Sequence, residues 1–182
     1  MKAGLRIAGA HRELARLAAQ FDALDRMVRF DPKLLDLRVP RVSRWSIGQQ
    51  VDHILRVLER GVEVFGGRRE PLPKKINLLG RLILSLDWIP RGLGKSPRSV
   101  VPAEAPAAAD LGERLSLLRE RYVVRRFPDE VLSNEEPFFP HPFFRGLCAS
   151  ESLRFLATHT RHHLKIIADI RRGARFGDAV AG

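Results

Sequence analysis

The chain has 182 residues, of which 45% are hydrophobic and 29% charged. These values are ordinary for a globular protein and exclude a collagen-like fibre, a disordered tail and a disulfide miniprotein. The length predicts one domain spanning residues 1–182. Cys148 is the only cysteine, so no intramolecular disulfide can form, and we expect a reduced protein with a cytoplasmic location.

The charge is strongly basic, with a formal net value of +11, and 26 of the 32 basic residues are arginine. Such a charge favours association with nucleic acid or with an anionic membrane. The basic residues are scattered, however, and no run of five of them occurs. No helix-turn-helix signature is present either, and charge alone supports association rather than base reading. The sequence therefore argues against nucleic acid as the partner.

No segment has the length and hydropathy of a transmembrane helix. The most apolar stretch, residues 76–89, is interrupted by Arg81 and Asp87. It is too short to span a bilayer, and a peripheral membrane contact there is an alternative that the sequence leaves open. The N-terminus lacks the apolar core of a signal peptide, because Arg6, His11 and Arg12 interrupt it.

The first predicted helix runs from about Gly9 to Arg29. Its apolar residues recur at steps of three and four and form one stripe: Leu14, Leu17, Ala18, Phe21, Leu24 and Val28. Asp31-Pro32 ends the helix, because the residue before a proline avoids the helical region. Residues 35–42 are the one short stretch that we predict to be extended.

The second predicted helix begins after Trp45, where Ser46 and Gln49 have the spacing of a capping box. We interpret Trp45 as a residue that packs against the helix it opens. The apolar stripe of this helix consists of Ile47, Val51, Ile54, Leu58, Val62 and Phe65, and Gly66-Gly67 ends it. A third, shorter helix is predicted over residues 76–88.

The rest of the chain predicts two more long helices, separated by loops. Residues 89–107 are rich in proline and glycine and indicate an ordered loop or crossover, after which Asp110 is predicted to cap a helix over residues 111–126. Residues 127–147 form a second loop, whose phenylalanines are predicted to plug the bundle end or a dimer face. The last helix covers residues 150–172. Together these elements predict an all-α four-helix bundle with long crossover loops.

The strongest chemical signal is the pair His159 and His163 in the last helix. Residues four apart on a helix share a face, so two imidazoles can hold one metal ion. Their face is the apolar stripe, which consists of Ser152, Leu156, His159, His163, Ile166 and Ile170. Burying imidazoles without partners costs a few kcal/mol, so either a shared cation or hydrogen bonds must offset the cost. Thr160 stands where a zinc protease has its glutamate, which argues against a metalloprotease.

A metal site needs at least one more ligand, and His53 is the best candidate, at the edge of the second helix's stripe. His162 is offset by about 100° from His163 and should face away from the ion. His141, in a proline-rich loop, could approach the mouth of the bundle. His11 is predicted to be solvated.

Three segments resemble motifs of the DinB-like superfamily, in the order in which that family carries them. Residues 45–54 resemble its W-S-x-x-E-x-x-x-H-L helix start, and residues 159–167 resemble its last-helix motif H-x-x-x-H-x-x-Q-I. Residues 141–147 resemble the H-P-x-F-G-x-L loop of one branch. The resemblance covers about Gly9 to Arg172.

This resemblance implies a four-helix bundle that binds a divalent metal through His53, His159 and His163. Three neutral nitrogens leave positions for water or substrate, and nitrogen ligands suit Zn, Ni and Fe alike. Some members are thiol-dependent transferases or isomerases, so the resemblance implies a metal-dependent hydrolase or a thiol-dependent transferase or isomerase. The substrate would be a small molecule, anionic or a low-molecular-weight thiol, and a homodimer paired through two bundle helices is expected.

The sequence departs from the family pattern at residues around the ligands. Ile166 stands where a glutamine is expected, Gln50 or Gln49 where a glutamate is expected, and Arg145 where a glycine is usual. His141 and His162 are candidates for a supporting shell or for the mouth of the site. The alternative function is a non-catalytic binding or regulatory bundle. Cys148, just before the last helix, is interpreted as an inert buried residue rather than a reactive thiol.

Overall fold

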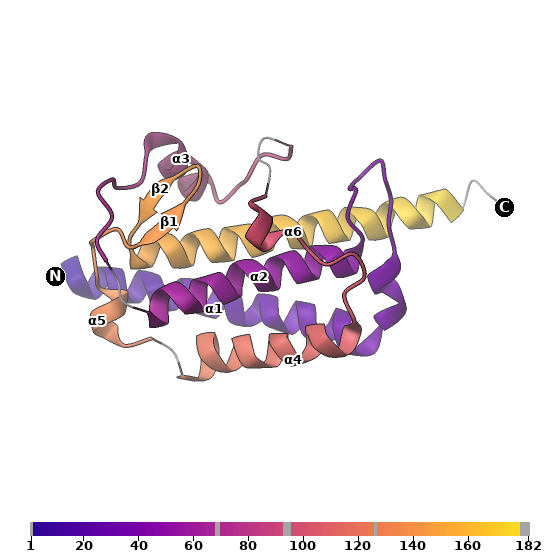
Figure 1. The fold of residues 1–182 in the computed structure, drawn as a ribbon, viewed down its shortest axis with the longest axis horizontal. Coiled ribbons are helices and arrows are strands. Elements are labelled where there is room, and N and C mark those ends of the chain that lie inside the picture. Colours follow the sequence, from indigo (N-terminus) through magenta and orange to yellow (C-terminus); the bar gives the residue numbers. More distant parts are fainter. Residues whose placement is uncertain (1, 68–69, 93–95, 126, 179–182) are drawn as a thin grey trace.

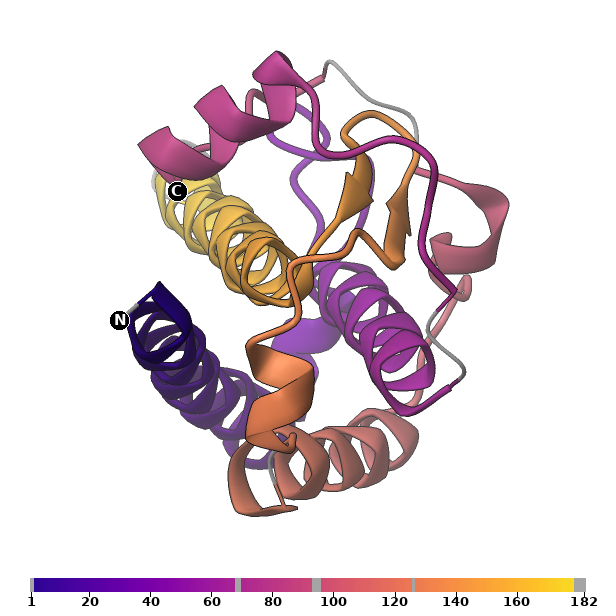
Figure 2. The same cartoon turned by 90° about the vertical axis from the view of Figure 1, so that its left-hand side faces the viewer.

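The computed structural model describes residues 2–67, 70–92, 96–125 and 127–178. Within these ranges, four long helices form a bundle (Figures 1 and 2): α1 (Lys2–Phe30), α2 (Ile47–Gly66), α4 (Ala108–Arg119) and α6 (Ala149–Asp178). Helices α1 and α2 each pack against both α4 and α6, so α2 and α6 are neighbours. The predicted all-α four-helix bundle is confirmed.

Shorter elements lie in the connections. They are η1 (Pro32–Asp36), α3 (Leu78–Leu86), η2 (Arg98–Val100), η3 (Glu120–Arg125), α5 (Asp129–Leu132), β1 (Phe139–His141) and β2 (Arg145–Leu147). The connection from α2 to α4 carries α3 and η2 past α6 and α2, which makes it the predicted long crossover. No helix in the described part of the chain is both long enough and apolar enough to cross a membrane.

The start of α2 forms as its sequence predicts. The Ser46 hydroxyl accepts a hydrogen bond from the Gln49 N–H at 3.2 Å, and the Gln49 side-chain oxygen accepts one from the Ser46 N–H at 3.0 Å. This capping box satisfies two N–H groups that would otherwise have no partner at the helix end. It also sets the position at which α2 begins, and therefore the direction in which the side chains of its second turn point.

Two local predictions are wrong. Asp110 does not cap α4, because the helix begins at Ala108 after Ala107, and Asp110 instead pairs with Arg114 at 3.1 Å from within the first turn. Alanine is the best helix former, so this alanine-rich stretch extends the helix upstream. Residues 35–42 are not an extended strand, since their first part belongs to the turn of η1.

The predicted loop over residues 127–147 contains a β-hairpin that sequence analysis missed. Strands β1 and β2 pair antiparallel, with Phe139 opposite Leu147. Arg145, where glycine is usual in the family loop, has a φ of 71°, in the left-handed region that favours glycine. Three-residue strands are too short to show an alternating pattern.

Of the loop's phenylalanines, Phe138, Phe139 and Phe144 are buried, while Phe143 is 48% exposed.

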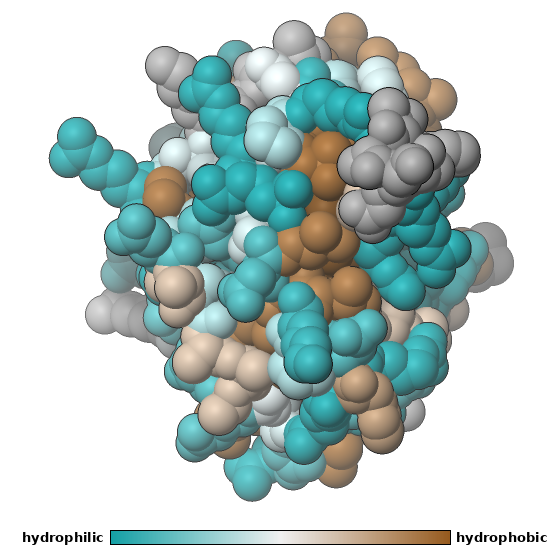
Figure 3. Space-filling view, turned by 90° about the vertical axis from the view of Figure 1, so that its right-hand side faces the viewer, coloured by the Kyte–Doolittle hydropathy of each residue, from teal (hydrophilic) through white to brown (hydrophobic). Residues whose placement is uncertain are grey.

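The core runs the length of the bundle, and aromatic residues fill the end near the hairpin. Tyr122 is fully buried and donates its hydroxyl hydrogen to the Leu58 carbonyl at 2.8 Å, and burial raises the pKa of this hydroxyl. The ring of Phe65 lies 5.3 Å from that of Phe138. At the opposite end of the bundle, apolar residues reach the surface in a narrow strip between hydrophilic side chains (Figure 3).

We expect Gly61→Ala to destabilise the protein by about 1–3 kcal/mol, because overpacking outweighs the gain in helix propensity. A Cβ at Gly61 would lie 2.2 Å from the Tyr122 hydroxyl oxygen and 2.9 Å from a Leu156 methyl carbon. Urea unfolding measures the change. The control is Gly112→Ala, whose Cβ would meet only Val28 at 3.7 Å and which should stabilise by up to about 1 kcal/mol. Equal effects of the two variants would contradict the packing explanation.

Candidate metal centre

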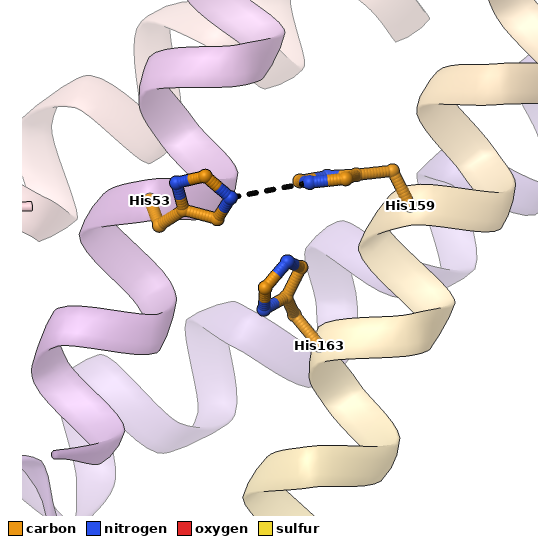
Figure 4. Close-up of side chains that lie close together, drawn as sticks. All are labelled: His53, His159 and His163. Carbon is orange, nitrogen blue, oxygen red and sulfur yellow. Dashed lines mark hydrogen bonds between the residues drawn. The ribbon is translucent and has the colours of Figure 1, made fainter. Parts of the chain in front are cut away.

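Three histidines from two neighbouring helices converge between α2 and α6. His53 projects from α2, and His159 and His163 project from successive turns of α6, so that the three rings face one another (Figure 4). Each offers a nitrogen atom, and these three atoms all lie within 4.8 Å of one another. His53 and His163 are buried, while His159 is partly exposed. The structure therefore brings together the three residues that the resemblance implied as ligands.

The spacing of the rings fits a single small cation. A tetrahedral ion with nitrogen ligands at about 2.0–2.1 Å separates two of these nitrogens by about 3.3 Å. The Nε2 atoms of His53 and His159 are 3.2 Å apart. The three imidazoles therefore have the chemistry that a divalent transition metal requires, and the nitrogens of His53 and His159 already have the required separation.

Hydrogen bonds on the far side of two rings determine which nitrogen faces the centre. Nδ1 of His53 donates to the Val100 carbonyl at 2.6 Å, and Nδ1 of His163 donates to the Gln50 side-chain oxygen at 2.6 Å. Carbonyl oxygens only accept, so each Nδ1 carries the proton and each neutral ring keeps a lone pair on Nε2. Metal-binding histidines are typically oriented by such bonds.

The orientation of the Gln50 amide is itself fixed by a neighbour. Its nitrogen donates to the Ser43 hydroxyl at 2.9 Å, which leaves the amide oxygen for His163. Of the two glutamines near the glutamate position of the family motif, Gln50 reaches the histidines, whereas the Gln49 side chain belongs to the capping box.

His159 is held differently from the other two histidines. Its Nδ1 is buried and has no hydrogen-bond partner among the described residues. The ring instead packs between Phe155, at 5.5 Å between centroids, and His163, at 4.5 Å. The orientation of this ring therefore rests on aromatic packing and on the contact of its Nε2 with Nε2 of His53 at 3.2 Å.

Trp45 belongs to the candidate site, which sequence analysis missed. Its ring lies 5.0 Å from the ring of His53, whereas a tryptophan in a hydrophobic staple would pack on the residue five positions later. That residue is Gln50, which is polar. Because a hydrophobic staple needs an apolar residue at this position, the glutamine in the sequence indicates that Trp45 contacts a different residue.

Burial keeps the three rings neutral. It lowers the pKa of His53, with the Val100 carbonyl opposing the shift, and it lowers the pKa values of His159 and His163 well below their usual range, with the neighbouring imidazoles adding to the effect. A neutral imidazole is the form that binds a metal. The rings are therefore in their binding form near neutral pH.

A buried carboxylate next to His53 is fully paired and is not a free ligand. Asp52 has a side chain that is 1% exposed and forms ion pairs with Arg114 at 2.7 Å and with Arg56 at 3.0 Å. It also accepts the Ala103 N–H at 2.7 Å. Although burial alone would raise the pKa of Asp52, these hydrogen bonds lower it. Asp52 thereby ties α2 to α4 and to the crossover that supplies Val100.

His162 lies beside the three histidines and not among them. Its ring meets that of His163 edge-on at 5.0 Å. Burial and, to a smaller extent, Arg91 lower its pKa to about 4. His162 also lines a cavity of about 380 Å³ on the adjacent face of α6, together with Asp87, Trp88, Ile89, Arg91, Thr158, Arg161 and Lys165.

His141 lies at the tip of the hairpin and also outside the group of three. Its Nδ1 accepts the backbone N–H groups of Phe143 at 3.2 Å and Phe144 at 3.0 Å. Its ring stacks on Phe144 at 4.0 Å and meets Phe155 at 4.5 Å. Phe155 also contacts His159, so one aromatic ring separates the hairpin tip from the centre.

Cys148 directly precedes α6 and is partly buried. Burial raises the pKa of its thiol, and the charge of the Glu151 carboxylate adds to the shift, although hydrogen bonds with Ser150 and the Glu151 backbone oppose part of it. A raised pKa disfavours the reactive thiolate. This environment supports the interpretation of Cys148 as an inert residue.

Comparison with known families agrees with this geometry. The family profile of the DinB superfamily matches residues 13–167. The chain belongs to the DinB superfamily. The matched region begins in α1 and ends in α6, so it contains both helices of the three-histidine group. No curated protein and no solved structure matches the chain significantly.

We expect the pH dependence of stability to report the buried state of His141. Burial lowers its pKa to about 4, against about 6.5 in an unfolded chain. Between these values the unfolded chain binds a proton that the folded chain does not, so stability is complete above about pH 6.5 and falls as the pH decreases towards 4.

Comparing wild type with His141→Asn isolates this effect, because the asparagine oxygen can accept the same backbone N–H groups without titrating. Urea unfolding at pH 7 and at pH 4.5 should show that wild type loses about 2–3 kcal/mol more than the variant. An equal loss in both proteins would contradict the assignment.

Proposed function

We propose that His53, His159 and His163 hold one divalent metal ion, which is Zn, Ni or Fe. The observation that carries this proposal is the pair of Nδ1 hydrogen bonds, because they leave the Nε2 lone pairs of His53 and His163 directed at the same point as His159. Membership of the DinB superfamily supports the same assignment. His141 and His162 are proposed as supporting residues at the edge of the centre.

We infer that the centre is of the catalytic type. A divalent ion with three neutral nitrogen ligands supplies Lewis acidity that lowers the pKa of a bound water or thiol. The protein contributes rigid orientation of His53 and His163, and aromatic walls from Trp45 and Phe155 that limit access of water. These features support a metal-dependent hydrolase or a thiol-dependent transferase or isomerase.

The cavity beside His162 supports an anionic small molecule or a low-molecular-weight thiol as substrate. Arg91, Arg161 and Lys165 line it. Arg91 pairs with Asp169 at 2.6 Å and Arg161 pairs with Asp87, while the Lys165 ammonium forms no ion pair within the described residues. This cation is available to a carboxylate of the substrate.

The alternative is a non-catalytic binding or regulatory bundle with nucleic-acid affinity from its net charge of +11. Internal ion pairs weaken this alternative, since many arginines are engaged with acidic residues of the chain itself: Arg16, Arg29, Arg56, Arg60, Arg91, Arg114, Arg119, Arg125, Arg161 and Arg172. We propose a cytoplasmic homodimer that pairs through two bundle helices. Light scattering tests this state of assembly.

Metal analysis of purified protein tests the ligands. Wild type should bind about one ion per chain. His53→Ala and His159→Ala should both lose the ion, because each variant keeps only two of the three imidazole ligands. His11→Ala is the matched control, since His11 lies on α1 beside Asp129, outside the group of three, and should keep the ion. Full metal content in both ligand variants would refute the assignment.

Gln50→Leu should lower metal affinity by about 10- to 100-fold, because it removes the acceptor that holds Nδ1 of His163. Competition with a chelator measures the affinity. The control is Gln20→Leu, which removes a glutamine whose amide nitrogen bonds the Ala157 carbonyl at 2.9 Å rather than a histidine ring, and it should leave the affinity unchanged. Equal affinities of wild type and Gln50→Leu would show that the Gln50 oxygen does not orient the ligand.

A further inference from the structure

Helix α3 presents an apolar face to the outside of the molecule. Leu78, Leu79, Leu82 and Leu86 are 83%, 54%, 53% and 60% exposed. At 100° per residue these four side chains fall within a single sector of the helix. The face is therefore a continuous leucine stripe, which we call the α3 stripe.

The other side of α3 attaches it firmly to the protein. Gly80, Ile83 and Leu84 are buried, and a Cβ at Gly80 would lie 2.8 Å from Phe144. At the N-terminus of the helix, the Asn77 side chain donates to the Phe143 carbonyl at 2.8 Å. Figure 2 shows the helix on the outside of the bundle, beside α6 and the hairpin. The leucines are thus held outward and cannot turn into the core.

Several exposed residues next to the stripe in the sequence are basic or aromatic. Lys74, Lys75 and Arg81 are exposed, and none of their side chains forms an ion pair within the described residues. Trp88 follows the helix and is 54% exposed. The acidic residue next to it, Asp87, is turned inward, where it accepts hydrogen bonds from Arg16 at 2.8 Å and from Thr158 at 2.6 Å.

This combination is specific to α3 among the described residues. The other large apolar side chains that are well exposed are dispersed over the chain: Leu5, Phe30, Val101, Leu117, Val124 and Phe143. A contiguous exposed apolar surface on a protein that dissolves in water marks a contact site. The α3 stripe is such a surface, with unpaired cations beside it.

We propose that the α3 stripe docks the protein on an anionic lipid membrane. Leucines enter the boundary between headgroups and acyl chains, a tryptophan sits at that boundary, and nearby lysine and arginine residues bind anionic headgroups. Charge selects this occupant over a second copy of the chain at this face, because Lys74, Lys75 and Arg81 beside one stripe would repel the same residues beside the other.

Sedimentation of the full chain with vesicles tests the proposal. The protein should sediment with vesicles of phosphatidylcholine and phosphatidylglycerol and stay in solution with vesicles of phosphatidylcholine alone. Added salt should release it, because salt screens the attraction between exposed charges. Equal sedimentation with both kinds of vesicle, or with neither, would overturn the proposal.

Two sets of variants locate the contact. The triple variant Leu79→Ser, Leu82→Ser and Leu86→Ser should weaken binding by on the order of tenfold for each leucine. Lys74→Gln and Lys75→Gln should each weaken it by about fivefold. The matched controls are the double variant Leu117→Ser and Val124→Ser, whose residues are exposed in α4 and in η3, and Lys33→Gln, exposed on η1. Both controls should bind as wild type does.

A different result would indicate that the α3 stripe binds a second copy of the chain rather than a membrane. Light scattering would then show a wild-type dimer that the leucine triple variant converts to a monomer, and this result would overturn membrane docking by the stripe. Circular dichroism spectra that match wild type establish that the triple variant folds. Loss of vesicle binding with an unchanged state of assembly supports the proposal.

Discussion

The organisation of this protein depends on the burial of imidazole rings between two antiparallel helices. A ring in that position loses much of its contact with water, and a hydrogen-bond partner for a polar nitrogen offsets part of the cost. The Val100 carbonyl and the Gln50 amide provide partners for two of the Nδ1 atoms. The Nε2 atoms of His53 and His163 then have their lone pairs directed towards the space that they share with His159, which is the condition for binding a cation.

This constraint extends well beyond the ligands. His53 is positioned only if α2 starts at the capping box of Ser46 and if the crossover runs close enough to present the Val100 carbonyl. Asp52 secures that crossover through the Ala103 N–H and links it to α4 through Arg114. A substitution in this network would therefore reach the centre without touching a ligand.

The long helices and the two α6 histidines could be predicted because a helix repeats every 3.6 residues and apolar stripes reveal its buried face. The roles of Gln50 and Trp45 could not, because each depends on which residues of another element lie opposite. The role of Val100 could not be predicted from its residue type, because it contributes a backbone carbonyl that every residue has. The hairpin that ends at Leu147 was missed because three residues are too few for a strand pattern, and Asp110 was misassigned because alanines upstream extend α4.

The hydrogen bond that His53 donates to the Val100 carbonyl in η2 has a consequence for sequence divergence. A backbone carbonyl is present whatever the side chain, so replacing Val100 by another residue preserves the acceptor. Lengthening or shortening the crossover by a residue, in contrast, would displace that oxygen from the ring. Among related chains, the spacing between α3 and α4 should accordingly vary less than the amino acids that fill it.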